Sequence, residues 1–201
     1  MTAFHFRGFV AALLILAHAA TAAVAAPDPA SDGKTAAALR QRADKGDAEA
    51  ALQLGNLLNR NQGLTATFGH AADWYRKGCA LNSLSACHNA GVAYEQGRYG
   101  VQRNPAEAAN FYLQAAERAF LPSQFNLAAL YANAQVTSMD NREGLKWLLV
   151  AQKGAAQCGD KSVCKLILED RRGNRARLEA MLTAAERCEA LQLAEAWRPL
   201  P

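Results

Sequence analysis

One pattern of small and apolar residues recurs three times along this chain of 201 residues. Each copy has a small or apolar residue at positions 1, 5 and 9, which fall on one face of a helix. The copies are AALQLGNLL from residue 50, ACHNAGVAY from residue 86 and SQFNLAALY from residue 123. Position 6 is always Gly or Ala, which lets a neighbouring helix approach closely. Successive copies begin 36 and 37 residues apart, a period typical of repeat proteins.

A second pattern follows each of these segments. Its copies are AADWYRKG from residue 71, AANFYLQA from residue 108 and GLKWLLVA from residue 144. Each begins and ends with a small residue and carries an aromatic pair or Trp-Leu in the middle, which would fill the gap that the small residues leave. Two helices per unit predict an α/α solenoid, in which each unit buries its apolar face against the next.

The chain is therefore predicted to be all-α, a right-handed solenoid of antiparallel helix pairs with about three to four repeats plus capping helices. The expected parts are a capping helix at 34–45, repeats at about 46–82, 83–119 and 120–157, and a C-terminal helix pair within 158–198. That last pair would be a short helix after Asp160 and a longer one from about Asn174 to Trp197. Asn104 before Pro105, and Asp140, are expected to begin helices.

Residues 1–25 have the features of a secretory signal peptide. Arg7 precedes the apolar segment VAALLILAHAA, which is short for a membrane span, and small residues lead to a cut expected between Ala25 and Ala26. Cleavage would remove one positive charge and lower the net charge from +4 to +3. Residues 26–33 would be a flexible lead. We expect a periplasmic or secreted bacterial protein without stable membrane insertion; the alternative is an uncleaved membrane anchor.

Residues 94–116, YEQGRYGVQRNPAEAANFYLQAA, closely resemble the consensus of the Sel-one-like repeat family, relatives of the tetratricopeptide repeats. The resemblance covers residues 46–154. It implies an adaptor or regulator that binds a protein or peptide in the cell envelope or host, with no catalysis and no cofactor. Partners among secretion, cell-wall or host-interaction proteins fit this resemblance.

Five cysteines in an oxidising compartment predict disulfides. The segment CALNSLSAC, with Cys79 and Cys87, is similar to cysteine-rich exported members of the family, and the resemblance implies that these two bridge adjacent helices. Cys158 and Cys164 lie at the corresponding junction further along and form a second candidate pair. Cys188 would be free, or would replace Cys164 as the partner of Cys158.

In stacked α/α repeats, the first helix of each pair lines the concave face. Three carboxamides, Gln53, Asn89 and Asn126, occupy one position in three consecutive units, and carboxamides can donate to and accept from a peptide backbone. The alternative is that they are ordinary polar residues facing water. The candidate binding residues on this face are Gln53, Asn56, Arg60, His88, Asn89, Gln96, Phe125, Asn126 and Asn133.

The alternative to a binding function is an enzyme, with β-lactamase or penicillin-binding activity as claimed for cysteine-rich relatives. Two Ser-x-x-Lys matches occur, at Ser31–Lys34 and Ser162–Lys165, but the partner motifs Ser-Asp-Asn and Lys-Thr-Gly are missing from the sequence. Ser162 is expected to cap a short helix instead.

Metal and nucleic-acid binding are not expected. No ligand spacing for zinc occurs, and Cys87 and His88 point apart because they are adjacent on a helix. Aromatic and basic residues do not interleave in the way that nucleic-acid binding favours. The basic cluster around Arg171 and Arg172 is interpreted as a solvated helix start, with an anionic partner site as the alternative.

Overall fold

The computed structural model describes residues 29–135, 140–158 and 161–201, and every regular element in these ranges is a helix. The predicted signal peptide and the first residues of the predicted lead lie outside the described residues. The elements are α1 (Pro29–Asp44), α2 (Ala48–Arg60), η1 (Gln62–Leu64), α3 (Thr65–Phe68), α4 (Ala71–Ala80), α5 (Leu84–Gln96), α6 (Pro105–Ala116), α7 (Leu121–Ala132), α8 (Asn141–Gln157), α9 (Ser162–Glu169), α10 (Asn174–Ala180) and α11 (Ala184–Ala196).

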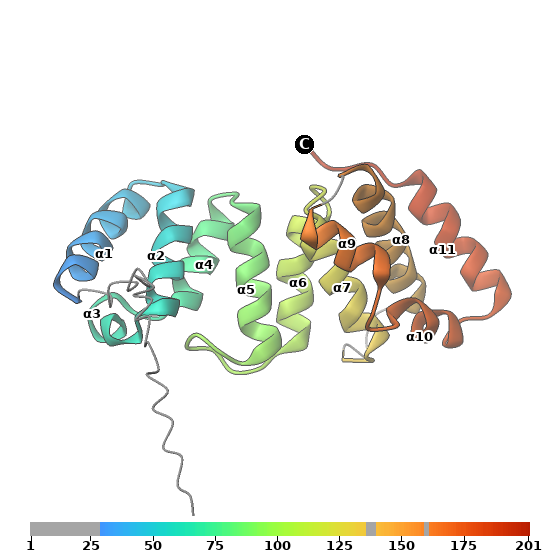
Figure 1. Ribbon diagram of the computed structural model, residues 1–201, viewed down its shortest axis with the longest axis horizontal. Helices are drawn as coiled ribbons and strands as arrows, with labels where there is room; N and C mark the ends of the chain where they lie inside the picture. Colours follow the sequence, from blue (N-terminus) through green and yellow to red (C-terminus); the bar gives the residue numbers. More distant parts are fainter. Residues whose placement is uncertain (1–28, 136–139, 159–160) are drawn as a thin grey trace, which may run out of the picture.

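Helices α1, α2, α4, α5, α6, α7 and α8 stack side by side in chain order, and the short α3 lies outside this row (Figure 1). Helix α2 packs on α4, α5 on α6 and α7 on α8, and each pair also packs on the next pair. Helix α1 covers the open side of α2 at the start of the stack. The predicted all-helical solenoid is confirmed. We call α2, α5 and α7 the A helices, and α4, α6 and α8 the B helices.

The recurring glycine and the recurring tyrosine fit together. A Cβ atom added to Gly55 would lie 2.5 Å from the ring of Tyr75, and one added to Gly91 would lie 2.6 Å from the ring of Tyr112. Both rings are buried, at 2% and 0% exposure. Any larger residue at either glycine would displace a ring that fills the core, so the small residues of the A helices set the distance to the B helices.

Polar residues begin most of the stacked helices. The Asn104 side chain accepts a hydrogen bond from the backbone N–H of Glu107, and Pro105 is the first helical residue of α6. The Asp140 side chain accepts from the N–H of Arg142 at the start of α8. Each cap satisfies an N–H group that has no partner inside its helix, and both predicted starts are confirmed.

Three local expectations are wrong. Helix α1 begins at Pro29, so part of the predicted flexible lead is helical, and Asp32 there accepts a hydrogen bond from Asn61 at 3.0 Å. The single long helix from Asn174 is two helices, because Thr183 starts α11 with a capping box. Ser162 does not cap α9; the residue before the helix is Lys161, and Ser162 is the first helical residue.

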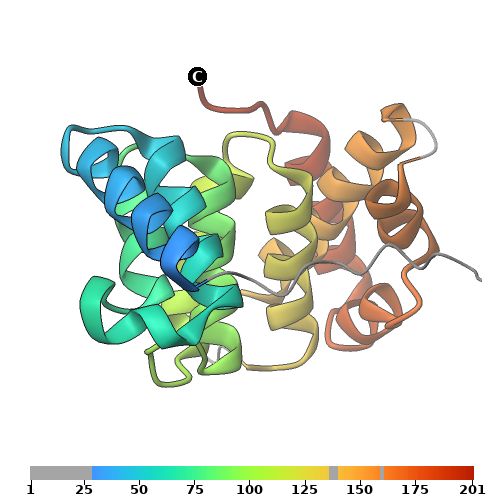
Figure 2. The same ribbon diagram turned by 60° about the vertical axis from the view of Figure 1, so that its left-hand side comes forward.

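The last three helices pack back on the end of the stack. Helices α9, α10 and α11 all contact α8, and α10 also contacts α7 (Figure 2). Trp197, just after α11, places its ring 5.9 Å from that of Trp147 on α8. The C-terminal segment then returns to the turn after α6, where the N–H of Leu200 donates to the carbonyl of Glu117 at 2.7 Å. These contacts close the apolar end that a repeat would otherwise expose.

Candidate functional site

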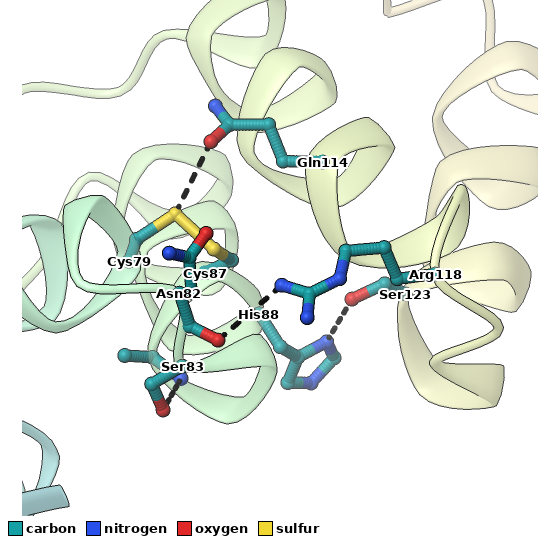
Figure 3. The surroundings of a disulfide bond; sticks show 9 residues. Cys79, Asn82, Ser83, Cys87, His88, Gln114, Arg118 and Ser123 are labelled. Atoms are coloured by element: carbon teal, nitrogen blue, oxygen red, sulfur yellow. Dashed lines mark hydrogen bonds between the residues drawn. A yellow bond between two sulfur atoms is a disulfide. The ribbon is translucent and has the colours of Figure 1, made fainter. Parts of the chain in front are cut away.

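A disulfide joins the first two helix pairs (Figure 3). Cys79 lies at the end of α4 and Cys87 in the first turns of α5, with Cα atoms 4.5 Å apart, and both side chains are buried. This separation lies within the range that disulfides span. The tight turn between α4 and α5 places the two residues at the same level, and Gln114 of α6 brings its Oε1 within 3.4 Å of Cys79 Sγ. The bridge thus lies where three helices meet.

The second cysteine pair ties α9 to the end of α8. Cys158 follows α8 and Cys164 lies in α9, with Cα atoms 6.5 Å apart, and the structure joins their side chains as a disulfide. Cys188 lies on α11, exposed, and is the cysteine without a disulfide partner among the described residues. The structure therefore contains the Cys158–Cys164 arrangement and not the Cys158–Cys188 alternative.

The predicted row of carboxamides is not three equivalent free groups. Gln53 is exposed and donates to Glu49, one turn earlier on the same helix, at 2.9 Å. Asn89 donates from Nδ2 to Oδ1 of Asn56 at 3.3 Å, and the hydroxyl of Tyr75 donates to the same oxygen at 3.0 Å. Asn56 therefore accepts the hydrogen bond of a buried tyrosine, and Asn89 donates to the same Asn56 oxygen, a role that the sequence pattern did not reveal.

The third carboxamide belongs to an equivalent network one unit further on. Asn126 donates from Nδ2 to the hydroxyl oxygen of Tyr112 at 3.3 Å, and that hydroxyl donates to Glu95 at 2.6 Å. Burial, followed by the nearby Glu95 carboxylate, raises the pKa of Tyr112, so the hydroxyl stays a donor. The amide groups of Asn89 and Asn126 thus have partners inside the fold.

Three other predicted residues lie at the C-terminal ends of the A helices. Arg60 is the last residue of α2, Gln96 is the last residue of α5, and Asn133 follows α7. All three side chains are exposed. Gln96 lies eight residues after His88, Asn133 lies eight residues after Phe125, and Arg60 lies on a different helix, α2. The structure therefore does not gather the nine predicted residues into one site.

A pocket of about 250 Å³ opens between the A helices α5 and α7 and the closing helix α9. Three predicted residues line it: His88, Phe125 and Asn126. The remaining lining comes from Pro122 on α7 and from the segment beginning at α9, and consists of Val163, Leu166, Ile167, Arg171 and Arg172. We call it the α5–α7–α9 pocket.

His88 anchors the inner side of this pocket. Its Nδ1 lies 3.0 Å from Ser123 Oγ on α7 (Figure 3), and its ring packs 5.5 Å from the rings of Tyr112 and Phe120. Burial lowers the pKa of His88 to about 4, because the charged imidazolium would lose its hydration. The ring is therefore neutral near pH 7 and lines the pocket without adding charge.

Sequence reasoning missed the contribution of Arg171 and Arg172 to this pocket. They were expected to lie on a solvated helix start, but they form the turn between α9 and α10, beside His88 and Asn126. The available sequence signal was the segment directly before them, SVCKLILE, because Leu166, Ile167 and Leu168 are consecutive and cannot all lie on one helix face. In the structure Ile167 is buried and Leu166 is 56% exposed at the pocket.

The two Ser-x-x-Lys matches show no catalytic arrangement. Ser31, Lys34, Ser162 and Lys165 are all exposed, and the Nζ of Lys165 faces Glu169 at 3.9 Å. Across the described residues, no group of three His, Cys, Asp or Glu side chains is placed to hold a metal ion. No helix within the same residues has the length and apolar character required to span a bilayer.

Comparisons with known proteins agree with the helix pairs. The sequence profile of the Sel1 repeat matches residues 48–83, 84–120 and 121–151. No curated protein sequence matches the chain.

Two solved structures share the fold. One is a protective antigen present in uropathogenic Escherichia coli strains that displays an SLR fold, with 25% identity and a TM-score of 0.61 over 81% of this chain and 32% of that protein. The other is a Sel1 repeat protein from Oxalobacter formigenes, with 21% identity and a TM-score of 0.56 over 81% of this chain and 64% of its own. The chain therefore spans less than two thirds of each of these proteins.

Proposed function

The chain belongs to the Sel1 repeat family, and from that premise we propose that it is an exported adaptor or regulator that binds another protein or a peptide. The proposed binding surface is formed by the A helices α2, α5 and α7. The observation that carries the proposal is the α5–α7–α9 pocket, in which apolar side chains, a neutral histidine and two arginines come together. Solenoids act by presenting such extended surfaces, and the proposed function needs no covalent chemistry.

Two features support the export part of the proposal. Residues 1–25 have the composition of a signal peptide, and the two cysteine pairs suit an oxidising compartment. We expect the mature protein to begin at Ala26. Mass spectrometry of the protein from the periplasmic fraction tests this start, and an intact N-terminus in a membrane fraction would contradict it.

Site-specific photo-crosslinking tests the binding surface. A benzophenone amino acid replaces Phe125, beside the pocket, and in a matched variant it replaces Asn110, which is exposed on the B helix α6. Irradiation of intact cells should yield a discrete protein adduct from position 125 and none from position 110. Adducts from position 110 alone, or none from either, would contradict a binding role for the A helices.

An enzyme assay tests the rival function. The purified mature protein is incubated with a chromogenic β-lactam, and we expect no turnover above that of the heat-denatured sample. Turnover that Ser162→Ala abolishes would overturn the adaptor proposal.

A further inference from the structure

The size of the α5–α7–α9 pocket limits what can occupy it. Its volume of about 250 Å³ is below the roughly 300–1,000 Å³ typical of pockets for drug-sized molecules. The space suits one large side chain, such as Phe or Leu, better than a free metabolite. The apolar part of the wall, where such a side chain would pack, consists of Pro122, Phe125, Val163, Leu166 and Ile167.

The charges at the rim favour an anionic neighbour for that side chain. Glu169 is shared by two cations, Arg171 Nε at 2.7 Å and Lys165 Nζ at 3.9 Å. Arg172 makes no salt bridge with any described residue, and its side chain is exposed. Burial raises the pKa of Tyr112, and the positive charge of Arg172 acts in the opposite direction. The guanidinium of Arg172 is therefore close to the Tyr112 hydroxyl. Arg171 and Arg172 are the charged residues that line the pocket, and among the described residues its lining includes no Asp or Glu.

Two other carboxylates near the pocket residues are already engaged. Asp170 accepts hydrogen bonds from the backbone N–H groups of Asn174 at 3.1 Å and Arg175 at 2.8 Å, at the start of α10. Glu95 accepts the hydrogen bond of Tyr112 at 2.6 Å, and the same hydroxyl accepts from Asn126 Nδ2. An unpaired guanidinium beside an exposed apolar surface binds carboxylates well, because its planar N–H groups match the two carboxylate oxygens.

Polar groups at the base suit a peptide backbone. His88 uses Nδ1 toward Ser123, and Nε2 has no hydrogen-bond partner among the described residues. Asn126 uses Nδ2 toward Tyr112, and its Oδ1 is likewise unpartnered within the described structure. One ring nitrogen and one amide oxygen therefore stay available for the groups that a peptide presents.

We propose that the α5–α7–α9 pocket binds an internal acidic segment of a partner protein, with one large apolar side chain in the pocket and an adjacent Asp or Glu on Arg172. The proposal rests on the proposed peptide-binding function and specifies its ligand. Binding would join the last A helix to α9, so recognition depends on a closing helix that lies outside the three matched repeats.

A peptide selection on the mature, oxidised protein tests the proposal. The probe is a library of acetylated and amidated octapeptides, captured on immobilised protein and identified by mass spectrometry. We expect enrichment of peptides that carry Asp or Glu within two positions of Phe, Leu or Met. The enriched peptide then enters a titration by fluorescence anisotropy, together with versions in which the apolar residue is Gly or the acidic residues are Lys.

Matched arginine variants locate the charge contact. Arg172→Gln should weaken the affinity for the enriched peptide about tenfold or more, which is the factor expected for the loss of one charge-assisted hydrogen bond. Arg175→Gln removes the same charge from α10, where Arg175 pairs with Glu179 at 2.8 Å, and should leave the affinity within about twofold. Leu166→Ala should weaken binding while the circular dichroism spectrum stays unchanged, since Leu166 is exposed.

Several outcomes would overturn the proposal. They are no enrichment, equal binding of the Gly or Lys peptides, equal losses in Arg172→Gln and Arg175→Gln, or binding that requires a free C-terminal carboxylate. Failure here leaves the proposed function standing if position 125 still crosslinks to a partner. Failure of both experiments removes the binding function itself.

Discussion

The stack from α2 to α8 and the closing helices α9–α11 follow different packing rules. In the stack, each helix packs mainly on the helices before and after it in the row, and a glycine meets a tyrosine ring in each of the first two pairs. The closing helices pack mainly on α7 and α8 rather than on one another. A periodic sequence therefore specifies neighbours, whereas the end of a solenoid depends on particular side chains that cover one exposed face.

One repeat position shows the difference directly. Trp74, Phe111 and Trp147 occupy equivalent places on the three B helices. The first two are partly exposed, whereas Trp147 is 1% exposed because the closing segment covers it, with Trp197 against its ring. The same residue class is thus a partly exposed side chain within the array and a core residue at its end.

The largest expected effect comes from breaking the stack. Tyr112→Ala removes a fully buried ring between Gly91 and the core and should lower the free energy of unfolding by about 3–5 kcal/mol. Trp197→Ala removes a half-buried ring from the closing segment and should cost less. Urea unfolding of both variants measures the difference. A Trp197→Ala loss equal to or above that of Tyr112→Ala would contradict the distinction between stack and closing segment.

Removing the two disulfides should have different effects in the stack and in the closing helices, in both kind and size. Replacing Cys79 and Cys87 by Ser should lower stability by about 2–2.5 kcal/mol, as expected for closing a loop of this length. The same replacement at Cys158 and Cys164 should chiefly speed amide exchange in α9, because that bridge holds a short helix at the edge.

Reduction of the wild-type protein is the control for both cysteine variants. Reductant should lower the melting temperature of the wild type and of the Cys158/Cys164 variant, but not that of the Cys79/Cys87 variant by the same amount. An unchanged wild-type melt would mean that the bridge between the first two units contributes nothing.

Sequence reasoning predicted the stack well because periodicity reports on neighbouring helices. The pairing of Gly55 with Tyr75 and the start of α6 at Asn104 follow from local spacing and local capping. The break at Thr183 was missed, although Thr183 and Glu186 fit a capping box, because the surrounding segment is continuously helix-compatible.

The candidate site was harder to predict because it joins residues far apart in the chain. His88 and Arg172 line the same pocket because α9 and the turn after it return to the side of α5 and α7, and no repeat period relates these residues. Gln53, Asn89 and Asn126 do occupy equivalent positions on the three A helices, but their amide groups already have hydrogen-bond partners within the chain. Asn89 donates to Asn56, which also accepts from the Tyr75 hydroxyl, whereas Asn126 donates directly to the Tyr112 hydroxyl. These partners follow from side-chain geometry that no periodicity encodes.

Acid should weaken the contact between α5 and α7. Burial lowers the pKa of His88 to about 4 from 6.5, so between these values the unfolded chain binds a proton that the folded protein does not. Stability should therefore fall as the pH drops below 6.5, by about 1–1.5 kcal/mol at pH 5.5. Urea unfolding at pH 7.5 and 5.5 measures this change, and His88→Gln should reduce it. An equal change in the variant would assign the acid sensitivity to other groups.

The smallest expected effects come from the helix caps and test how far each region unfolds as a unit. Asn104→Ala and Thr183→Ala each remove a side-chain cap, worth about 1 kcal/mol. In α6, which packs between α5 and α7, the loss should appear in global unfolding, because that helix cannot open alone. Helix α11 packs mainly on α8. Loss of the Thr183 cap should therefore speed amide exchange over residues 184–196 by about fivefold, without the same change in global unfolding. Hydrogen exchange of both variants distinguishes these outcomes. Faster exchange confined to α6 in Asn104→Ala would show that the stack also opens one helix at a time. The stack and the closing helices would then differ in sequence pattern but not in the cooperativity of unfolding.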